Sequence, residues 1–115
     1  MIELNSEMFD DAVKSVKLVV VDFYASWCGP CKLISKVIGE TEEGLKTYDY
    51  IRFYKVNTDH EPDVSIRYNV NNLPTLIFFK NGVEAKRVGG MINKEKILEI
   101  LNELKVGKDA ETKTD

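Results

Sequence analysis

The chain is poor in the residues that mark several common kinds of protein. Its 115 residues include two cysteines, one histidine, one tryptophan and three prolines. Both cysteines lie in one short motif, so the sequence cannot supply the network of disulfides that holds small secreted domains together. His60 is the only further cysteine or histidine, and a four-coordinate zinc site built from these residue types needs more ligands than that.

The sequence also lacks an excess of positive charge and any long apolar run. Lysine and arginine number 16 against 19 aspartate and glutamate residues, a net charge of −3. A general nucleic-acid binder needs a basic face, so we expect no nucleic-acid partner. No apolar run approaches the roughly 20 residues of a membrane span, so we expect no membrane association. Residues 1–7 do not resemble a secretory signal, and with so few cysteines this favours the cytoplasm.

What the sequence does contain suits one compact domain. Hydrophobic residues make up 43% of the chain and charged residues 30%, values typical of a soluble domain with its own core. There is no internal repeat. We predict a single domain over residues 1–105 and a polar, flexible tail over residues 106–115, where aromatic residues are absent.

Hydrophobic periodicity predicts nine elements in the order β-α-β-α-β-α-β-β-α. The strands are expected at residues 2–4, 18–24, 51–57, 75–79 and 83–88, and the helices after Asn5 or Ser6, at about 31–48, at about 61–68 and after Asn93. The second helix is expected to bury a stripe made of Leu33, Ile34, Val37, Ile38 and Leu45. Asn81-Gly82 predicts a tight hairpin turn. An early βαβ unit followed by a hairpin and a helix predicts an α/β fold, a mixed sheet with helices on both faces.

The strongest chemical signal is the motif Cys28-Gly29-Pro30-Cys31 between a predicted buried strand and a predicted helix. A Cys-x-x-Cys pair in that context predicts a redox-active disulfide, because a helix N-terminus favours the thiolate. A buried structural pair and half of a zinc site are the alternatives. We expect Cys28 to be the attacking thiol and Cys31, further into the helix and more buried, to resolve the mixed disulfide. No cation stands between the cysteines, which favours a reductant over an oxidant.

Asp22 is the second candidate, because it interrupts the apolar strand that precedes the motif. Burial raises the pKa of a carboxyl group, and an aspartate that titrates near neutral pH can carry protons to and from Cys31, through water. The alternative is an aspartate at a strand end that faces solvent.

Six short motifs stand in the order found in thioredoxins, and through them the chain resembles that family from Ile2 to about Leu104. They are VDFYA at 21–25, WCGPCK at 27–32, KVNTD at 55–59, LPT at 73–75, FFKNG at 78–82 and VGG at 88–90. The resemblance implies the thioredoxin fold: a central mixed five-stranded sheet of order 1-3-2-4-5 with four helices on its two faces.

The resemblance also implies roles that the residues alone do not give. Lys55 is expected to approach the Asp22 carboxylate, although by itself it would be taken for an ordinary exposed strand lysine. The Leu73–Pro74 bond is expected to be cis and to pack against the disulfide, although most bonds before proline are trans. A cis bond would leave the Leu73 backbone free to pair with an extended substrate segment.

A weakly polar substrate-binding patch is expected around Cys28. Its members are Trp27, Gly29, Pro30, Leu73, Pro74, Thr75, Gly89 and Gly90. Simple core packing is the alternative for Trp27. Lys36 stands where thioredoxins usually carry a helix-kinking proline, so we expect that helix to bend less.

By resemblance the chain is a general protein-disulfide reductase that serves cell redox homeostasis. It would bind no cofactor and would receive electrons from NADPH through a flavoprotein thioredoxin reductase. Ribonucleotide reductase, peroxiredoxin and methionine sulfoxide reductase are the expected substrates, and a monomer is the expected state. Two alternatives stay open: a thioredoxin-fold binding or scaffold subunit with incidental thiols, and a more oxidising disulfide exchanger.

Overall fold

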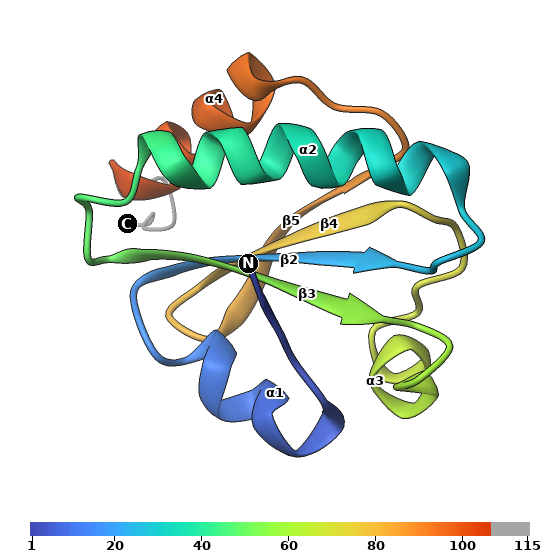
Figure 1. Cartoon of the computed structure of the whole chain (residues 1–115). Coiled ribbons are helices and arrows are strands. Elements are labelled where there is room, and N and C mark those ends of the chain that lie inside the picture. The colour runs from blue at the N-terminus through green and yellow to red at the C-terminus, as the bar shows by residue number, and fades with distance from the viewer. Residues whose placement is uncertain (107–115) are drawn as a thin grey trace.

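The computed structural model describes residues 1–106, in which one sheet lies between two pairs of helices (Figure 1). The strands are β1 (Ile2–Glu3), β2 (Leu18–Tyr24), β3 (Ile51–Asn57), β4 (Thr75–Lys80) and β5 (Val83–Gly89). The helices are α1 (Ser6–Val13), α2 (Gly29–Gly44), α3 (Pro62–Arg67) and α4 (Lys94–Lys105). Figure 1 shows α2 and α4 on one face of the sheet and α1 and α3 on the other.

The strand order is β1-β3-β2-β4-β5, which confirms the predicted order. β1, β3 and β2 run parallel, and β4 is antiparallel to both β2 and β5. β2 is therefore the central strand. Its residue Asp22 pairs in register with Lys55 of β3 on one side and with Leu76 of β4 on the other.

Two apolar clusters, one on each face of the sheet, explain why β2 is hydrophobic almost throughout. Val19, Val21 and Phe23 pack with residues of α1 and α3. Leu18 and Val20 pack with residues of α2 and α4. Because successive strand side chains point to opposite faces, a strand covered on both faces reads as one continuous apolar run.

Side-chain capping fixes the starts of α1 and α4. The Asn5 and Asn93 side chains accept hydrogen bonds from the backbone N–H groups of Met8 and Lys96, at 2.9 and 2.8 Å. These bonds satisfy N–H donors that have no partner within the helix. The sequence had left Asn5 and Ser6 as alternatives for the first cap, and Asn5 takes this position.

The prediction for the second helix was wrong in two respects. α2 begins at Gly29 and ends at Gly44, whereas residues 31–48 were expected. Leu33, expected in the buried stripe, is 59% exposed, and Thr41 is buried in its place with its hydroxyl donating to the Val37 carbonyl at 2.8 Å. The buried positions 31, 34, 38 and 41 recur every three or four residues, and Leu33 falls outside that row.

The turn between β4 and β5 is the predicted one. Asn81 and Gly82 both have positive φ angles, 53° and 83°, as a type I′ hairpin requires. The predicted domain boundary near residue 105 stays a prediction. α4 ends at Lys105, and residues 107–115 of the predicted tail lie outside the described part of the chain.

Two glycine substitutions are expected to change the free energy of unfolding in opposite directions. Gly82→Ala places a Cβ 2.8 Å from Lys14 Cγ at a positive φ and should cost about 1–2 kcal/mol. Gly39→Ala lies inside α2, where a Cβ meets no atom within 4 Å, and should stabilise by about 0.5–1 kcal/mol. Urea unfolding at neutral pH measures both. Equal effects of the two substitutions would contradict the backbone assignment at the turn.

Candidate active site

The two cysteines form a disulfide in the first turn of α2. Their Cα atoms are 5.3 Å apart. Cys28 is the N-cap residue, with extended backbone, and its Sγ accepts a hydrogen bond from the Cys31 backbone N–H at 3.2 Å. Pro30 sits in the first turn, where its missing N–H costs no helical hydrogen bond. The helix N-terminus therefore directs a donor at the Cys28 sulfur, as the sequence predicted.

Burial hardly distinguishes the two cysteines in this oxidised form. Cys28 is 5% exposed and Cys31 is 2% exposed. The expected difference in burial is therefore small, and it is the position in the helix that separates the two sulfurs. The neighbours Gly29 and Pro30 are exposed, so the disulfide lies directly beneath the surface.

Trp27 is not part of the core. Its side chain is 71% exposed, and its indole Nε1–H donates a hydrogen bond to Asp59 Oδ2 at 2.9 Å. Asn57 in turn accepts a hydrogen bond from the Asp59 backbone N–H at 3.0 Å. The indole is thus held at the surface next to Cys28, and core packing is excluded.

The segment that precedes β4 packs against the cysteines. The Leu73–Pro74 bond is cis, and Leu73 packs against the small cluster of Ala25, Cys28 and Cys31. Within residues 1–106 no hydrogen bond engages the Leu73 backbone. An extended peptide could therefore pair with Leu73 without displacing a bond of the protein.

The remaining patch residues are joined to this segment through the sheet. Thr75 pairs in register with Gly89, and the Gly90 N–H donates to the Pro74 carbonyl at 2.9 Å. Gly90 has φ 82°, a conformation that favours glycine. Pro74 and Thr75 are buried and Leu73 is half-buried, whereas Gly89 and Gly90 are exposed.

Asp22 is a buried carboxylate beneath α2. It is 1% exposed, and neither carboxylate oxygen has a hydrogen-bond partner among the described residues. Burial raises its pKa from the usual 3.8 to about 7, and the positive charge of Lys55 opposes part of that rise. Asp22 therefore titrates near neutral pH. The alternative of a solvent-facing aspartate is wrong.

Lys55 lies in register with Asp22, half-buried, with its ammonium 5.7 Å from the centroid of the Tyr24 ring. The Tyr24 hydroxyl donates to both carboxylate oxygens of Glu3, each at 3.0 Å. Sequence reasoning missed Glu3 and Tyr24 as neighbours of the site. The signal was the strand pairing, since β1 brings Glu3 beside Lys55.

Lys36, at the usual proline position, is exposed on α2, which is one uninterrupted helix from Gly29 to Gly44.

Among residues 1–106 no group of three or more cysteine, histidine or carboxylate side chains could hold a metal ion. The same residues include no helix with the length and hydropathy of a bilayer span.

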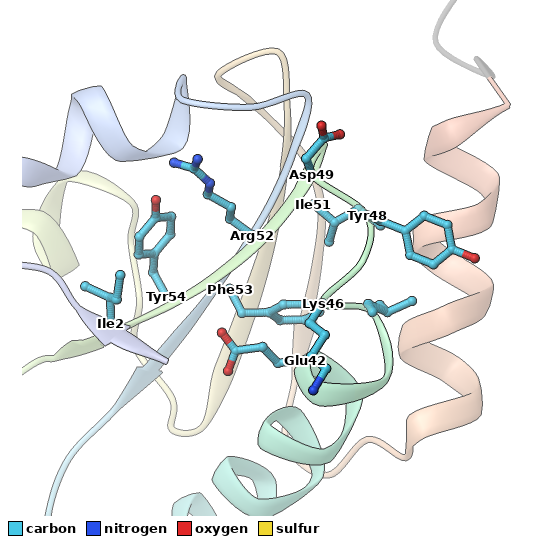
Figure 2. Close-up of a pocket in the computed structure, with 10 residues that line it drawn as sticks. Ile2, Glu42, Lys46, Tyr48, Asp49, Ile51, Arg52, Phe53 and Tyr54 are labelled. Carbon is cyan, nitrogen blue, oxygen red and sulfur yellow. The ribbon is translucent and has the colours of Figure 1, made fainter.

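One cavity among the described residues lies away from the cysteines. It has a volume of about 350 Å³. Figure 2 shows its lining, which comes from β1, β3, the C-terminal end of α2 and the loop between α2 and β3: Ile2, Glu42, Leu45, Lys46, Tyr48, Asp49, Ile51, Arg52, Phe53 and Tyr54. Because the cysteines occupy the opposite end of α2, this cavity is not part of the candidate active site.

The thioredoxin family model matches residues 1–103. The chain belongs to the thioredoxin family. It is 40% identical over 96 residues to a thioredoxin of Mycoplasma genitalium, with 84% of this chain and 91% of that protein covered. It is 48% identical over 82 residues to thioredoxin-1 of Saccharomyces cerevisiae, with 71% and 77% covered.

Solved structures agree with this assignment. A crystal structure of chloroplastic thioredoxin z is similar with a TM-score of 0.83 at 27% identity, covering 93% of this chain and 96% of the other. Thioredoxins are protein-disulfide oxidoreductases that typically need no bound cofactor. With its paired Cys28 and Cys31, this chain is a protein-disulfide reductase.

The titration of Asp22 should make the stability of the protein depend on pH. Between about pH 4 and pH 7 the folded state holds a proton on Asp22 that the unfolded state has lost, so stability falls as pH rises through this window. Asp22→Asn carries no such charge. Its stability advantage over the parent should grow across the window, by at most about 4 kcal/mol, and then level off.

Urea unfolding at several pH values measures this difference. Asp11→Asn, an exposed aspartate on α1, is the matched control and should show a constant difference from the parent. A constant difference for Asp22→Asn as well would show that Asp22 has an ordinary pKa in the folded protein.

Proposed function

We propose that Cys28 is the attacking thiol, Cys31 the resolving thiol and Asp22 the proton carrier of the disulfide reductase. The observation that carries this assignment is the hydrogen bond from the Cys31 N–H to the Cys28 sulfur at the start of α2. This donor stabilises negative charge on Cys28 in the reduced protein, whereas Cys31 lies inside the helix.

In the proposed cycle the Cys28 thiolate attacks one sulfur of a substrate disulfide. The substrate S–S bond breaks, a mixed disulfide forms with Cys28, and the other substrate sulfur leaves as a thiolate that takes a proton. The Asp22 carboxylate accepts the proton of Cys31, through water, and the Cys31 thiolate attacks the Cys28 sulfur. The second substrate thiolate leaves, and Cys28–Cys31 remains as the disulfide seen in the structure.

The substrate is an extended peptide segment that pairs with the Leu73 backbone and lies against the exposed patch. The unused hydrogen-bonding groups of Leu73 and the exposure of Trp27, Gly29, Pro30, Gly89 and Gly90 support this placement. Pro74 and Thr75 act through the backbone, since their side chains are buried. A small weakly polar patch with few fixed contacts suits many protein partners.

Partners and location follow from family membership. We propose that a flavoprotein thioredoxin reductase passes electrons from NADPH to the disulfide, and that ribonucleotide reductase, peroxiredoxin and methionine sulfoxide reductase are substrates. We further propose that the protein acts in the cytoplasm as a monomer. The acidic net charge of −3 and the single pair of cysteines support this setting.

Substitution of the two cysteines tests the assignment of their roles. In an insulin-reduction assay with dithiothreitol, Cys28→Ser and Cys31→Ser should both lose the acceleration given by the parent. Only Cys31→Ser should accumulate a mixed disulfide with a peptide disulfide, because it keeps the attacking thiol but not the resolving one. Mass spectrometry under non-reducing conditions detects that species.

The double variant Cys28→Ser/Cys31→Ser is the reference for this assay. A parent protein no faster than the double variant would leave a binding or scaffold role for the fold. Accumulation of the mixed disulfide in Cys28→Ser instead of Cys31→Ser would reverse the two assignments.

Asp22→Asn should slow the release of substrate from the mixed disulfide. The amide cannot accept the Cys31 proton, so we expect a loss of at least about tenfold in the single-turnover rate near pH 7. The loss should shrink near pH 9, where more of Cys31 ionises unaided. Asp11→Asn is again the control. Rates equal to those of the parent from about pH 6 to pH 9 would remove Asp22 from the mechanism.

A further inference from the structure

Four polar side chains lie side by side on the α2-facing side of the sheet, at the end where the cysteines lie. Glu3 of β1 pairs in register with Lys55 of β3, and Lys55 pairs with Asp22 of β2. Tyr24 follows two residues after Asp22 on the same strand, so it faces the same side. These four, Glu3, Tyr24, Lys55 and Asp22, are called the polar row below.

Contacts within the polar row are specific at one end. The Tyr24 hydroxyl donates to both Glu3 oxygens at 3.0 Å, which fixes the outer end of the ring. Burial, and next the hydrogen bond to Glu3, raise the pKa of Tyr24, so the hydroxyl stays a donor. The Lys55 ammonium lies 5.7 Å from the centroid of this ring, within the range of a cation–π contact.

The other end of the polar row has no direct bond. Neither Asp22 oxygen accepts a hydrogen bond from a described residue, yet the charge of Lys55 lowers the pKa of Asp22 against the effect of burial. Lys55 therefore acts from beyond hydrogen-bond distance. The effect of Lys55 on Asp22 depends on where the ammonium is held, and within residues 1–106 the contact that holds it is with the Tyr24 ring.

We propose that Glu3 and Tyr24 are positioning residues of the redox centre: the Glu3 carboxylate fixes the Tyr24 ring, and the ring keeps the Lys55 ammonium beside Asp22. Through this chain of contacts, β1 at the edge of the sheet tunes the proton affinity of a carboxylate on the central strand. The catalytic consequence rests on the proposed role of Asp22 as proton carrier, but the positioning itself does not.

The surroundings of Asp22 determine in which direction its ionisation should shift when Glu3 is removed. The charged and titratable groups on this face of the sheet around Asp22 are Lys55 from β3, Tyr24 from β2 and, one strand beyond Lys55, Glu3 from β1. Cys31 is buried on α2, which covers this face, and does not titrate while it is in the disulfide. β4 places the apolar Leu76 beside it. If Glu3 acted only as a distant negative charge, removing it would make Asp22 easier to ionise. If Glu3 acts by holding Lys55 in place, removing it makes Asp22 harder to ionise.

The test follows the ionisation of Asp22 in the oxidised protein, where the cysteines do not titrate. The carboxyl carbon shift of ¹³C-labelled Asp22 is measured against pH in the parent, in Glu3→Gln and in Tyr24→Phe. We expect the midpoint to rise in both variants, by on the order of half a pH unit. Glu7→Gln removes the same charge from an exposed site on α1 and should leave the midpoint unchanged.

Repeating the titrations in a Lys55→Met background isolates the pathway. There neither Glu3→Gln nor Tyr24→Phe should raise the midpoint, because the ammonium they position is gone. An unchanged midpoint or a fall in the single variants overturns the proposal, and so does a rise that persists without Lys55. Unchanged amide spectra of each variant show that the fold is retained.

A kinetic measurement distinguishes the positioning role of Glu3 and Tyr24 from the proposed role of Asp22 as proton carrier. If the pH profile of single-turnover reduction moves with the Asp22 midpoint in Glu3→Gln, both stand. If the midpoint moves and the profile does not, the positioning by Glu3 and Tyr24 stands and Asp22 is not the proton carrier.

Discussion

The seating of α2 on the sheet is the interaction on which the reactive centre depends. Ile34 and Ile38 are fully buried against the face of β2 that carries Leu18 and Val20. β2 ends at Tyr24 and the next helix is capped at Cys28, so the buried stripe fixes where the first turn of α2 lies. That turn both places the disulfide and supplies the N–H donor for one of its sulfurs. The first turn of α2 therefore sets both the position of the disulfide and the electrostatic environment of the Cys28 sulfur.

Asp22 occupies the same face of the same strand, where an apolar side chain would pack well. Leu18, Val20 and Leu76 make this face apolar next to Asp22, Lys55 is the nearest charged side chain along the sheet, and the described residues give the Asp22 oxygens no hydrogen bond. An unpaired buried charge costs free energy, so burial favours the protonated form of Asp22 and raises its pKa to about 7. The sheet tolerates Asp22 because its carboxyl group can hold a proton and be uncharged. The same ability to take up and release a proton near neutral pH suits the proposed transfer of a proton from a thiol.

Local and periodic signals were sufficient for most of the fold. The continuous apolar run of β2, the Asn93 cap and the Asn81-Gly82 turn each specify their own structure within a few residues. The cysteine motif located the candidate active site because both cysteines and the helix start lie within a few residues of sequence. The exposure of Leu33 was not predictable in this way, because Leu33 and Ile34 are both apolar and only the packing of α2 against the sheet decides which of them is buried. Contacts such as Glu3 with Tyr24 depend on the pairing of three strands and have no signal within either segment.

The hydrogen bond between Trp27 and Asp59 has a consequence for observing the protein. Trp27 is the sole tryptophan of the chain, directly precedes a redox-active cysteine and is largely exposed. Intrinsic emission excited at the indole band therefore originates at the reaction centre alone, with no background from the hydrophobic interior. The molecule carries a built-in optical reporter, so electron transfer and partner docking can be followed without attaching a dye.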